Sequence, residues 1–535
     1  MNKLDNSLLK VSNLAVSFDT VDGTIDAVQG INFELNKGQT LAIIGESGSG
    51  KSVTASVIMG ILSCPPGRIK HGEVFLNNQD ILLLSERERR KLMGSNITII
   101  FQDTLAHLNP VFTVGAQIAE CFQVHKGLNN KESWNKAVSL LKRVDIPNAS
   151  IRAKDFPHQF SGGQRQRVMI AMALALEPDI IIADEPTTAL DVTIQAKILD
   201  LLQELRDERN MGLILITHDL GVAAEIADDV IVLKSGKIVE HGSLKKVFSN
   251  PKHDYTRQLM NSIPGQKIDL EKKHKIIDFE PILEIHNITK SYETIACDNV
   301  SFKLYSNEIL GVVGESGSGK TTVSNLILRL TEPTSGEIFF HGKNIFDFTK
   351  KELFNFRRNV QVVFQDPFAS LNPTMNVFDI ISEPWVIHSG FLEKRFYSDK
   401  VSELLISVGL NSDDANRYPH QFSGGQRQRI AIARALALNP EVIICDEAVS
   451  ALDVSIQAQI INLLSDLRDK FSLSYIFIAH DLPVVRDLAD RLIVMKSGKI
   501  VEQGNSEDVF SNPEHPYTQD LLRASPIIHK LINND

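Results

Sequence analysis

The sequence predicts two tandem α/β domains, each with a parallel-sheet core, an antiparallel β subdomain and a helical subdomain. Three observations support this fold class. The same ordered set of motifs occurs twice along the chain. Short apolar runs alternate with stretches of helical periodicity, as strands and crossover helices do in a parallel sheet. Finally, 535 residues are too many for a single hydrophobic core.

The segment between the two halves is polar, charged and interrupted by Pro and Gly, from Ser262 to Pro281. Such a composition is typical of a linker. We therefore expect a first domain over residues 1–265, a linker over 266–281 and a second domain over 282–535.

The two subdomains are predicted from changes in periodicity. Residues 11–35 and 283–304 alternate apolar and polar side chains, which indicates half-buried antiparallel strands. Between Gln102 and Gly162, and again between Gln365 and Gly424, strand signals give way to helical periodicity. A helical subdomain inserted in each core follows from this change.

A glycine-rich motif that ends in Lys and a hydroxyl residue stands between a predicted strand and a predicted helix in each half. This is the pattern of a phosphate-binding loop. The first copy is Gly45, Glu46, Ser47, Gly48, Ser49, Gly50, Lys51 and Ser52, and the second is Gly314, Glu315, Ser316, Gly317, Ser318, Gly319, Lys320 and Thr321, followed by Thr322.

Each residue type in this motif has a role in holding phosphate. Glycines allow a tight turn whose backbone N–H groups point into one concavity, and the helix N-terminus behind it adds partial positive charge. Lys51 and Lys320 are predicted to reach the β- and γ-phosphates, and the hydroxyls of Ser52 and Thr321 to bind Mg²⁺. The alternative is a Gly/Ser-rich turn with an incidental lysine, which two copies in the same context make improbable.

Paired acids follow a buried apolar strand in each half. Asp184-Glu185 and Asp446-Glu447 would lie at the carboxyl edge of the sheet, where α/β proteins bind ligands. We expect the aspartates to hold Mg²⁺, mainly through water, and the glutamates to orient and deprotonate the attacking water. A strand that ends in a solvated acidic turn is the alternative, and it is disfavoured because a phosphate loop precedes each pair.

Two further features recur in both halves. His218 and His480 each end another apolar strand, and the recurrence favours a contact to the γ-phosphate over a purely structural role. A Ser-Gly-Gly-Gln motif begins a long helical run in each half, where Ser is a good N-cap. Spacing alone leaves open whether this motif binds an anion or only caps a helix. Its residues are Ser161, Gly162, Gly163, Gln164, Ser423, Gly424, Gly425 and Gln426.

Composition excludes several other classes of protein. A net charge of −10 argues against a nucleic-acid groove. No apolar run approaches the roughly 18 residues that span a bilayer, and the N-terminus has no signal-peptide core. The four cysteines are scattered without a paired motif, so neither a zinc site nor a disulfide framework is indicated. A soluble cytosolic protein is expected.

Taken together, these motifs resemble two nucleotide-binding domains of the ABC ATPase family fused in tandem, and the resemblance covers nearly the whole chain. It implies P-loop ABC ATPase domains that bind ATP and Mg²⁺ and hydrolyse ATP, with each site combining the phosphate loop of one domain and the signature of the other. It also implies catalytic and metal-binding roles for the glutamine-loop residues Gln102 and Gln365, and nucleotide contacts for Asp191 and Asp453. Phe18 and Tyr292 match the aromatic position that stacks on adenine, although as isolated aromatics both could equally be core residues.

A narrower resemblance points to ATPases of dipeptide and oligopeptide importers, including the fused microcin C/peptide and glutathione importers. It rests on the Asp-Pro-Phe-Ala-Ser-Leu-Asn-Pro run after Gln365 and on the Val-Phe-Ser-Asn-Pro motif with a later Tyr-Thr that closes each half. It implies an ATPase peripheral to the cytoplasmic face of the inner membrane. The partners would be two membrane permeases and an extracytoplasmic solute-binding protein, with one chain supplying both ATPase domains and no nucleic acid bound.

Two alternatives belong to other classes. A soluble tandem ABC protein acting on ribosomes or nucleic acid usually has a long charged linker or a coiled-coil insertion, and neither is visible. A regulatory ATP-binding module without turnover is disfavoured by the presence of both Glu185 and Glu447.

The chain also departs from the family pattern. Thr104 replaces the proline expected after Gln102-Asp103, so the docking groove of the first half is expected to differ in shape. Ala448 stands where the first half has Pro186, which leaves hydrolysis possible because Glu447 is retained. The C-terminal cysteine cluster of some peptide-importer ATPases is absent, so no iron–sulfur centre is expected.

Overall fold

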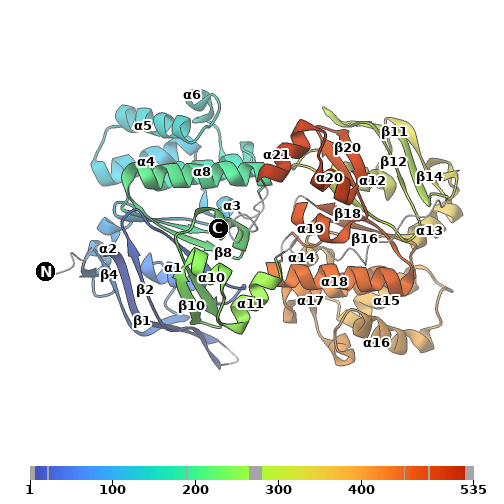
Figure 1. Cartoon of the computed structure of the whole chain (residues 1–535), viewed down its shortest axis with the longest axis horizontal. Helices are drawn as coiled ribbons and strands as arrows, with labels where there is room; N and C mark the ends of the chain where they lie inside the picture. Colours follow the sequence, from blue (N-terminus) through green and yellow to red (C-terminus); the bar gives the residue numbers. More distant parts are fainter. Residues whose placement is uncertain are drawn as a thin grey trace. The chain divides into compact units, whose positions relative to one another are not determined.

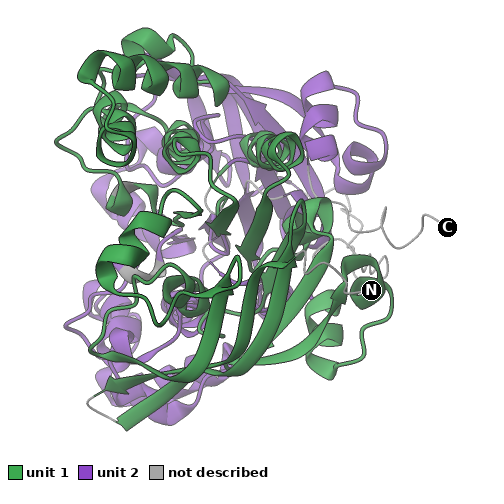
Figure 2. Cartoon of the chain, turned by 90° about the vertical axis from the view of Figure 1, so that its left-hand side faces the viewer, with its two compact units in different colours: residues 1–190, 194–261, 526–535 green, residues 191–193, 262–525 purple. Residues whose placement is uncertain are grey.

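The computed structural model describes residues 7–20, 23–187, 190–263, 280–450, 452–479 and 482–524. The chain divides into two compact units, which Figure 2 shows in different colours. Unit 1 is built from residues 1–190 and 194–261, and unit 2 from residues 191–193 and 262–525. The predicted linker at 266–281 lies almost wholly outside the described residues, so the predicted domain boundaries stay a prediction.

The core of unit 1 is a six-stranded sheet in the order β10-β9-β3-β8-β7-β6. Five strands run parallel and β10 pairs antiparallel at one edge. The strands β3, β7 and β8 are buried at every residue, as expected of strands that are covered on both faces. The strands are β3 (Thr40–Ile44), β6 (Ile97–Ile100), β7 (Ile180–Asp184), β8 (Gly212–Thr217), β9 (Asp229–Lys234) and β10 (Lys237–Ser243).

Unit 2 repeats this sheet in the order β16-β17-β18-β13-β19-β20. The parallel strands and the antiparallel edge strand occupy the same places as in unit 1. The predicted α/β class and the tandem repeat are therefore confirmed. The strands are β13 (Ile309–Val313), β16 (Val360–Val363), β17 (Val442–Asp446), β18 (Ser474–Ala479), β19 (Arg491–Lys496) and β20 (Lys499–Asn505).

Each unit has a second, antiparallel sheet formed by the segments whose side chains alternate. In unit 1 its order is β2-β1-β4-β5, and in unit 2 it is β12-β11-β14-β15. Both confirm the predicted β subdomains. The strands are β1 (Ser7–Thr20), β2 (Gly23–Asn36), β4 (Gly67–Leu76), β5 (Gln79–Asp80), β11 (Leu283–Ser291), β12 (Ile295–Leu304), β14 (Ser335–Phe340) and β15 (Lys343–Asn344).

The helices of unit 1 include the predicted helical subdomain. Figure 1 shows α4, α5 and α6 gathered at one end of this unit and β1 and β2 at the other. Helix α4 begins where the Thr113 hydroxyl accepts a hydrogen bond from the backbone N–H of Ala116, and it ends at Gly127 in the left-handed conformation. The helices are α1 (Lys51–Ile58), α2 (Glu86–Leu92), α3 (Thr104–His107), α4 (Val114–Lys126), α5 (Asn130–Arg143), α6 (Ala149–Arg152), α7 (Gly162–Leu174), α8 (Val192–Arg209), α9 (Leu220–Ile226), α10 (Leu244–Ser249) and α11 (Asp254–Asn261).

Unit 2 has corresponding helices, with the helical subdomain around α15 and α16. Its short helix α14 corresponds to α3 of unit 1. A short helix therefore forms after the glutamine loop in both units, even though Thr104 stands where unit 2 has Pro367. The helices are α12 (Lys320–Ile327), α13 (Lys350–Asn359), α14 (Pro367–Ser370), α15 (Val377–Ile387), α16 (Tyr397–Ser407), α17 (Gly424–Leu436), α18 (Val454–Phe471), α19 (Leu482–Leu488), α20 (Ser506–Ser511) and α21 (Pro516–Ala524).

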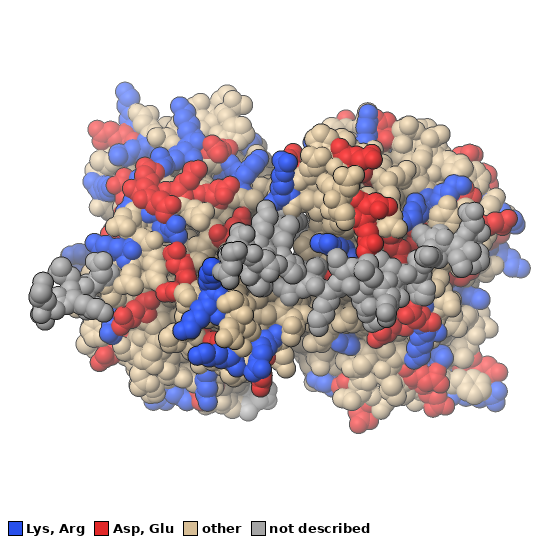
Figure 3. Space-filling view, viewed as in Figure 1, with Lys and Arg blue, Asp and Glu red and all other residues tan. Residues whose placement is uncertain are grey.

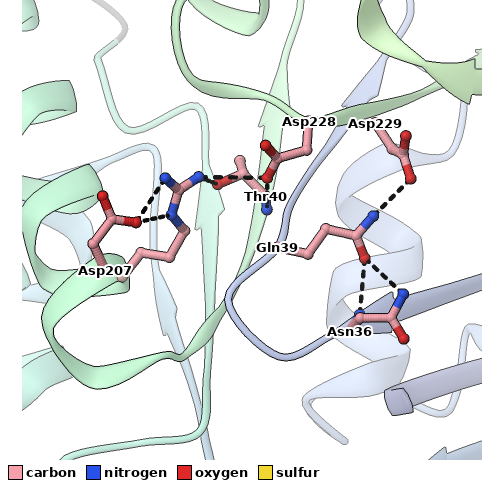
Figure 4. Close-up of polar contacts among 7 residues, drawn as sticks. Asn36, Gln39, Thr40, Asp207, Asp228 and Asp229 are labelled. Carbon is pink, nitrogen blue, oxygen red and sulfur yellow. Dashed lines mark hydrogen bonds and ion pairs between the residues drawn. The ribbon is translucent and has the colours of Figure 1, made fainter. Parts of the chain in front are cut away.

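A polar network fixes the start of the central strand β3 (Figure 4). The Asp228 carboxylate accepts a hydrogen bond from the Thr40 backbone N–H at 2.8 Å, and Arg206 donates to the Thr40 hydroxyl at 2.8 Å. In unit 2 the Asp490 carboxylate accepts from the Ile309 backbone N–H, also at 2.8 Å. Because β3 and β13 lead directly into the phosphate loops, these contacts hold the strands from which the loops project.

In the part of the chain that the structure describes, no helix is both long and apolar enough to cross a membrane.

Candidate functional site

The phosphate-loop motifs form tight turns between β3 and α1 and between β13 and α12. Three glycines of each loop have positive φ, at 156°, 77° and 103° in unit 1 and 152°, 76° and 103° in unit 2. A Cβ atom on Gly45 would stand 2.3 Å from the Leu233 carbonyl oxygen, and one on Gly314 would stand 2.2 Å from that of Met495. Glycine is therefore required for both backbone conformation and space.

The lysine of each loop is buried and folds back over the loop. Lys51 Nζ donates to the carbonyl oxygens of Gly45 at 2.7 Å and Glu46 at 2.9 Å. Lys320 makes the equivalent contacts at 2.8 and 2.9 Å. Burial lowers the pKa of Lys320, and the nearby Glu447 carboxylate opposes this shift. Each ammonium group thus stands beside the concavity in which backbone N–H groups can bind an anion.

The hydroxyl after each lysine contacts the aspartate that ends β7 in unit 1 or β17 in unit 2, two strands along the sheet from the strand that leads into the loop. Ser52 Oγ donates to Asp184 Oδ1 at 3.1 Å. In unit 2 burial, together with repulsion from Glu447, raises the pKa of Asp446 to about 6, and a hydrogen bond from Thr321 opposes this shift.

These groups fit Mg²⁺ and phosphate. Asp446 Oδ1 is buried and makes no hydrogen bond with any residue that the structure describes. Such an oxygen is suited to coordinate a metal ion or to accept a hydrogen bond from a water of that ion. The buried hydroxyls of Ser49 and Ser318 are likewise without a hydrogen-bond partner among the described residues. Hydroxyl and carboxylate oxygens are the ligands that Mg²⁺ prefers.

The glutamate that follows each aspartate is held in a left-handed backbone conformation. Glu185 has a φ of 47°, and its backbone N–H donates to the Ile216 carbonyl oxygen of β8 at 2.9 Å. Its carboxylate accepts a hydrogen bond from Gln102 Nε2 at 2.8 Å and stands 3.0 Å from His218 Nδ1. A positive φ at a non-glycine residue is uncommon and clusters at functional sites.

Unit 2 repeats this arrangement where it is described. Glu447 has a φ of 48°, and Gln365 Nε2 donates to its carboxylate at 2.7 Å. His480, which was predicted to contact the γ-phosphate, lies outside the described residues.

The signature motif caps α7 in unit 1 and α17 in unit 2. The Ser161 hydroxyl accepts from the Gln164 backbone N–H at 3.4 Å, and the Gln164 side chain accepts from the Ser161 N–H at 3.2 Å. Ser423 and Gln426 form the same capping box. The capped-helix interpretation is thus correct, and it leaves the N-terminal end able to bind an anion as well.

The two glycines of the signature differ in how much space the structure leaves for a side chain. A Cβ atom on Gly163 would stand 2.7 Å from Ile194 Cγ2 of α8, so this position needs glycine for helix packing. A Cβ atom on Gly162 would find its nearest neighbour, Leu190 Cδ2, at 3.8 Å. Packing therefore does not account for Gly162, and its contact with nucleotide stays a prediction.

The remaining predicted residues lie on separate elements. Asp191 immediately precedes α8, and Asp453 is the N-cap residue of α18. Phe18, on β1, is half-buried and packs partly against the core of unit 1. Tyr292 is 59% exposed, with Lys290 Nζ 5.0 Å from its ring centroid, so it is available for stacking and is not a core residue. The nucleotide-binding roles of these four residues stay predictions.

Sequence reasoning did not assign a site role to the tyrosine of the Tyr-Thr motif that closes each half. In the structure the Tyr255 hydroxyl accepts a hydrogen bond from the Glu46 backbone N–H of the phosphate loop at 3.1 Å. Tyr517 does the same for Glu315, also at 3.1 Å. The recurrence of this motif in both halves was the available signal.

Comparison with known proteins agrees with this geometry. The ABC transporter family model matches residues 28–188 and 297–450, once in each unit. The chain belongs to the ABC transporter family. The model for the oligopeptide/dipeptide transporter C-terminal region matches residues 239–294 and 501–534.

This ABC protein has relatives that match it over most of its length. It is 46% identical to the glutathione import ATP-binding protein GsiA of Shigella boydii over 97% of this chain and 90% of the relative. The identity and both shares are the same for the protein of that name in Escherichia coli strain K12. A solved structure of cbiO1 from Clostridium perfringens, part of the ABC transporter complex cbiONQ, is 28% identical, with a TM-score of 0.41, over 44% of this chain and 93% of that chain.

Family membership settles the reaction. The chain is an importer-type ABC ATPase that binds ATP with Mg²⁺ and hydrolyses it. The interpretation as two tandem ABC ATPase domains is confirmed, and the alternative of a ribosome- or nucleic-acid-directed protein is not favoured.

Proposed function

We propose that this chain energises the import of small peptides or peptide-like solutes such as glutathione. It would dock, peripheral to the cytoplasmic face of the membrane, on two permease subunits that receive solute from an extracytoplasmic binding protein. The observation that carries this proposal is the match of both C-terminal segments to the oligopeptide/dipeptide transporter region, together with the GsiA relatives. One chain, with domains at 1–265 and 282–535, would serve one permease pair.

The geometry of each unit supports a division of roles in hydrolysis. Lys51 and Lys320, with the loop amides, bind and orient the terminal phosphates. Mg²⁺, held by the hydroxyl after each lysine and by Asp184 or Asp446, neutralises phosphate charge when bound. Glu185 and Glu447 orient the attacking water and accept its proton.

The glutamine and histidine contacts give this assignment its physical basis. Gln102 donates to the Glu185 carboxylate at 2.8 Å, and His218, which directly follows β8, stands 3.0 Å from that carboxylate. Both side chains limit the rotamers of the base, which keeps it aimed at a water near the terminal phosphate. Gln365 supplies the same support for Glu447, at 2.7 Å.

Surface charge supports a protein partner over nucleic acid. On the face shown in Figure 3, Lys and Arg are interspersed with Asp and Glu over the described residues. A nucleic-acid groove collects basic side chains into a stripe, and the net charge of −10 argues in the same direction.

Affinity purification tests the partner proposal. The tagged chain is purified from detergent-solubilised membranes of its own host, and the co-purifying proteins are identified by mass spectrometry. We expect two integral membrane proteins, each present in the same molar amount as this chain. Recovery with ribosomal proteins or nucleic acid, or two copies per permease pair, would contradict the proposal.

Uptake measurements then test the solute class. Cells that carry or lack this chain are given labelled glutathione and a labelled tripeptide, with Lys51→Ala/Lys320→Ala as the matched inactive control. Uptake of at least one solute should require the active chain. If neither does, the assigned solute class is wrong.

A further inference from the structure

The C-terminal segment of each unit contacts the phosphate loop directly. Glu46 follows the first glycine of the loop, and its backbone N–H donates to the Tyr255 hydroxyl oxygen at 3.1 Å. Glu315 and Tyr517 make the same contact over the same distance in unit 2. This contact fixes the backbone at the start of a loop whose later N–H groups can bind phosphate.

The tyrosine ring is itself fixed from the core sheet. Tyr255 is buried, and Lys234, the last residue of β9, places its Nζ 4.4 Å from the ring centroid. Lys496, at the end of β19, lies at the same distance from Tyr517. Strands β9 and β19 neighbour the strands that lead into the loops, so each ring is packed beside the loop base.

The approach to each tyrosine is anchored by a carboxylate of the edge strand. Glu240, in β10, accepts hydrogen bonds from the backbone N–H groups of Lys252 at 2.9 Å and His253 at 3.1 Å. The Tyr255 N–H then donates to His253 Nδ1 at 3.1 Å. A chain of contacts therefore joins the core sheet to α11 and from there to the loop.

Unit 2 reproduces this chain of contacts. Glu502, in β20, accepts from the backbone N–H groups of Glu514 at 2.8 Å and His515 at 3.1 Å, and the Tyr517 N–H donates to His515 Nδ1 at 3.1 Å. The same set of partners at two places in one chain indicates a specific arrangement that does not depend on incidental packing.

The Tyr517 hydroxyl stays protonated at neutral pH. Burial raises the pKa of Tyr517 to about 12, and the Glu315 backbone hydrogen bond opposes that shift only in part. The protonated oxygen can accept the Glu315 N–H while its own proton is donated to the Glu315 carboxylate.

We propose that Tyr255 and Tyr517 are positioning residues for the two phosphate loops, through which the C-terminal segment of each unit sets the affinity for nucleotide. The loop is rich in glycine and would otherwise sample many conformations. A hydrogen bond to the amide of its second residue reduces the ordering needed when phosphate binds, and such preorganisation strengthens binding. The inference concerns nucleotide alone and stands apart from the solute and permease proposals.

Removal of the hydroxyl tests this inference without removing the ring. In the full chain, Tyr255→Phe and Tyr517→Phe are compared with Tyr397→Phe, a matched loss of a hydroxyl on α16 of the helical subdomain. Affinity for trinitrophenyl-ATP, KM and kcat for ATP, and the melting temperature are measured. Labelling with azido-ATP followed by peptide mapping shows which loop is affected.

We expect each loop-side variant to weaken nucleotide binding at its own loop by about 2- to 10-fold, the range for one lost hydrogen bond. The KM for ATP should rise, while kcat and the melting temperature should stay near the wild-type values. The control Tyr397→Phe should bind nucleotide normally. Glu240→Gln, which weakens the anchor without touching the loop, should shift binding at the Lys51 loop in the same direction. Wild-type affinity in both Phe variants, or a loss of kcat and melting temperature at unchanged affinity, would overturn the inference.

Discussion

Gln102 Nε2 donates a hydrogen bond to the Glu185 carboxylate at 2.8 Å, and Gln365 makes the same contact with Glu447 at 2.7 Å. Each pair joins the loop after an outer strand of the sheet to the end of the neighbouring strand. The glutamate that is proposed to accept a proton from water is therefore positioned by a glutamine. In the chain, the helical subdomain follows directly after this glutamine. This hydrogen bond links the carboxylate to the segment that leads into the helical subdomain.

Loss of the glutamine should lower turnover more than binding. We expect Gln102→Ala to reduce kcat by about 10- to 100-fold, because a carboxylate that is free to rotate is poorly aligned with the water. The KM for ATP should change little. Gln29→Ala, which removes an exposed side chain bonded to the Ser235 carbonyl oxygen, is the control and should leave both constants unchanged. Equal kcat values for Gln102→Ala and wild type would contradict the assigned role.

The two glycines of the first signature should respond differently to alanine. Gly163→Ala places a methyl group 2.7 Å from Ile194 Cγ2, and we expect a destabilisation of about 1–3 kcal/mol from this overpacking. Gly162→Ala meets nothing closer than 3.8 Å, and alanine favours a helix, so stability should stay within about 1 kcal/mol of wild type or rise. Differential scanning calorimetry of the full-length variants measures both. A larger loss of stability for Gly162→Ala than for Gly163→Ala would contradict the packing of Gly163 against Ile194.

Cysteine reactivity tests the β subdomain of unit 2. Burial raises the pKa of the Cys297 thiol to about 11, so that thiol should stay protonated and unreactive up to pH 9. Cys64 is exposed and should react with N-ethylmaleimide in the native protein. Peptide mapping by mass spectrometry should find Cys297 labelled only after denaturation. Comparable native labelling of both cysteines would be inconsistent with the packing of β12.

Local motifs were sufficient to predict the strands that carry the site. The apolar runs before Lys51 and Glu185 became β3 and β7, because apolar composition and the following polar residues define where a buried strand ends. The helical and antiparallel subdomains were predicted for the same reason, since their periodicity differs from that of the core. The family resemblance added the roles of residues such as Gln102, whose chemistry no local pattern reveals.

Contacts between distant segments could not be predicted from the sequence. The left-handed conformation of Glu185 depends on its hydrogen bond to Ile216 of another strand, and glutamate has no intrinsic preference for that conformation. The contact of Tyr255 with Glu46 joins residues 209 positions apart, so the Tyr-Thr motif marked a subgroup without indicating a site. The placement of Tyr292 at the surface was equally undetermined by its neighbours in sequence.

Steady-state ATP hydrolysis by Glu185→Gln, Glu447→Gln and the double variant tests whether these two glutamates drive hydrolysis in both units. Glutamine keeps the shape of the side chain but cannot accept a proton, so we expect a severe loss of ATP turnover in each single variant. The double variant should lose about 100-fold or more in phosphate release. Trinitrophenyl-ATP should still bind all three proteins as it binds wild type. A double variant that hydrolyses ATP at the wild-type rate would contradict the account, and an unchanged rate in Glu447→Gln alone would show that the second site does not turn over.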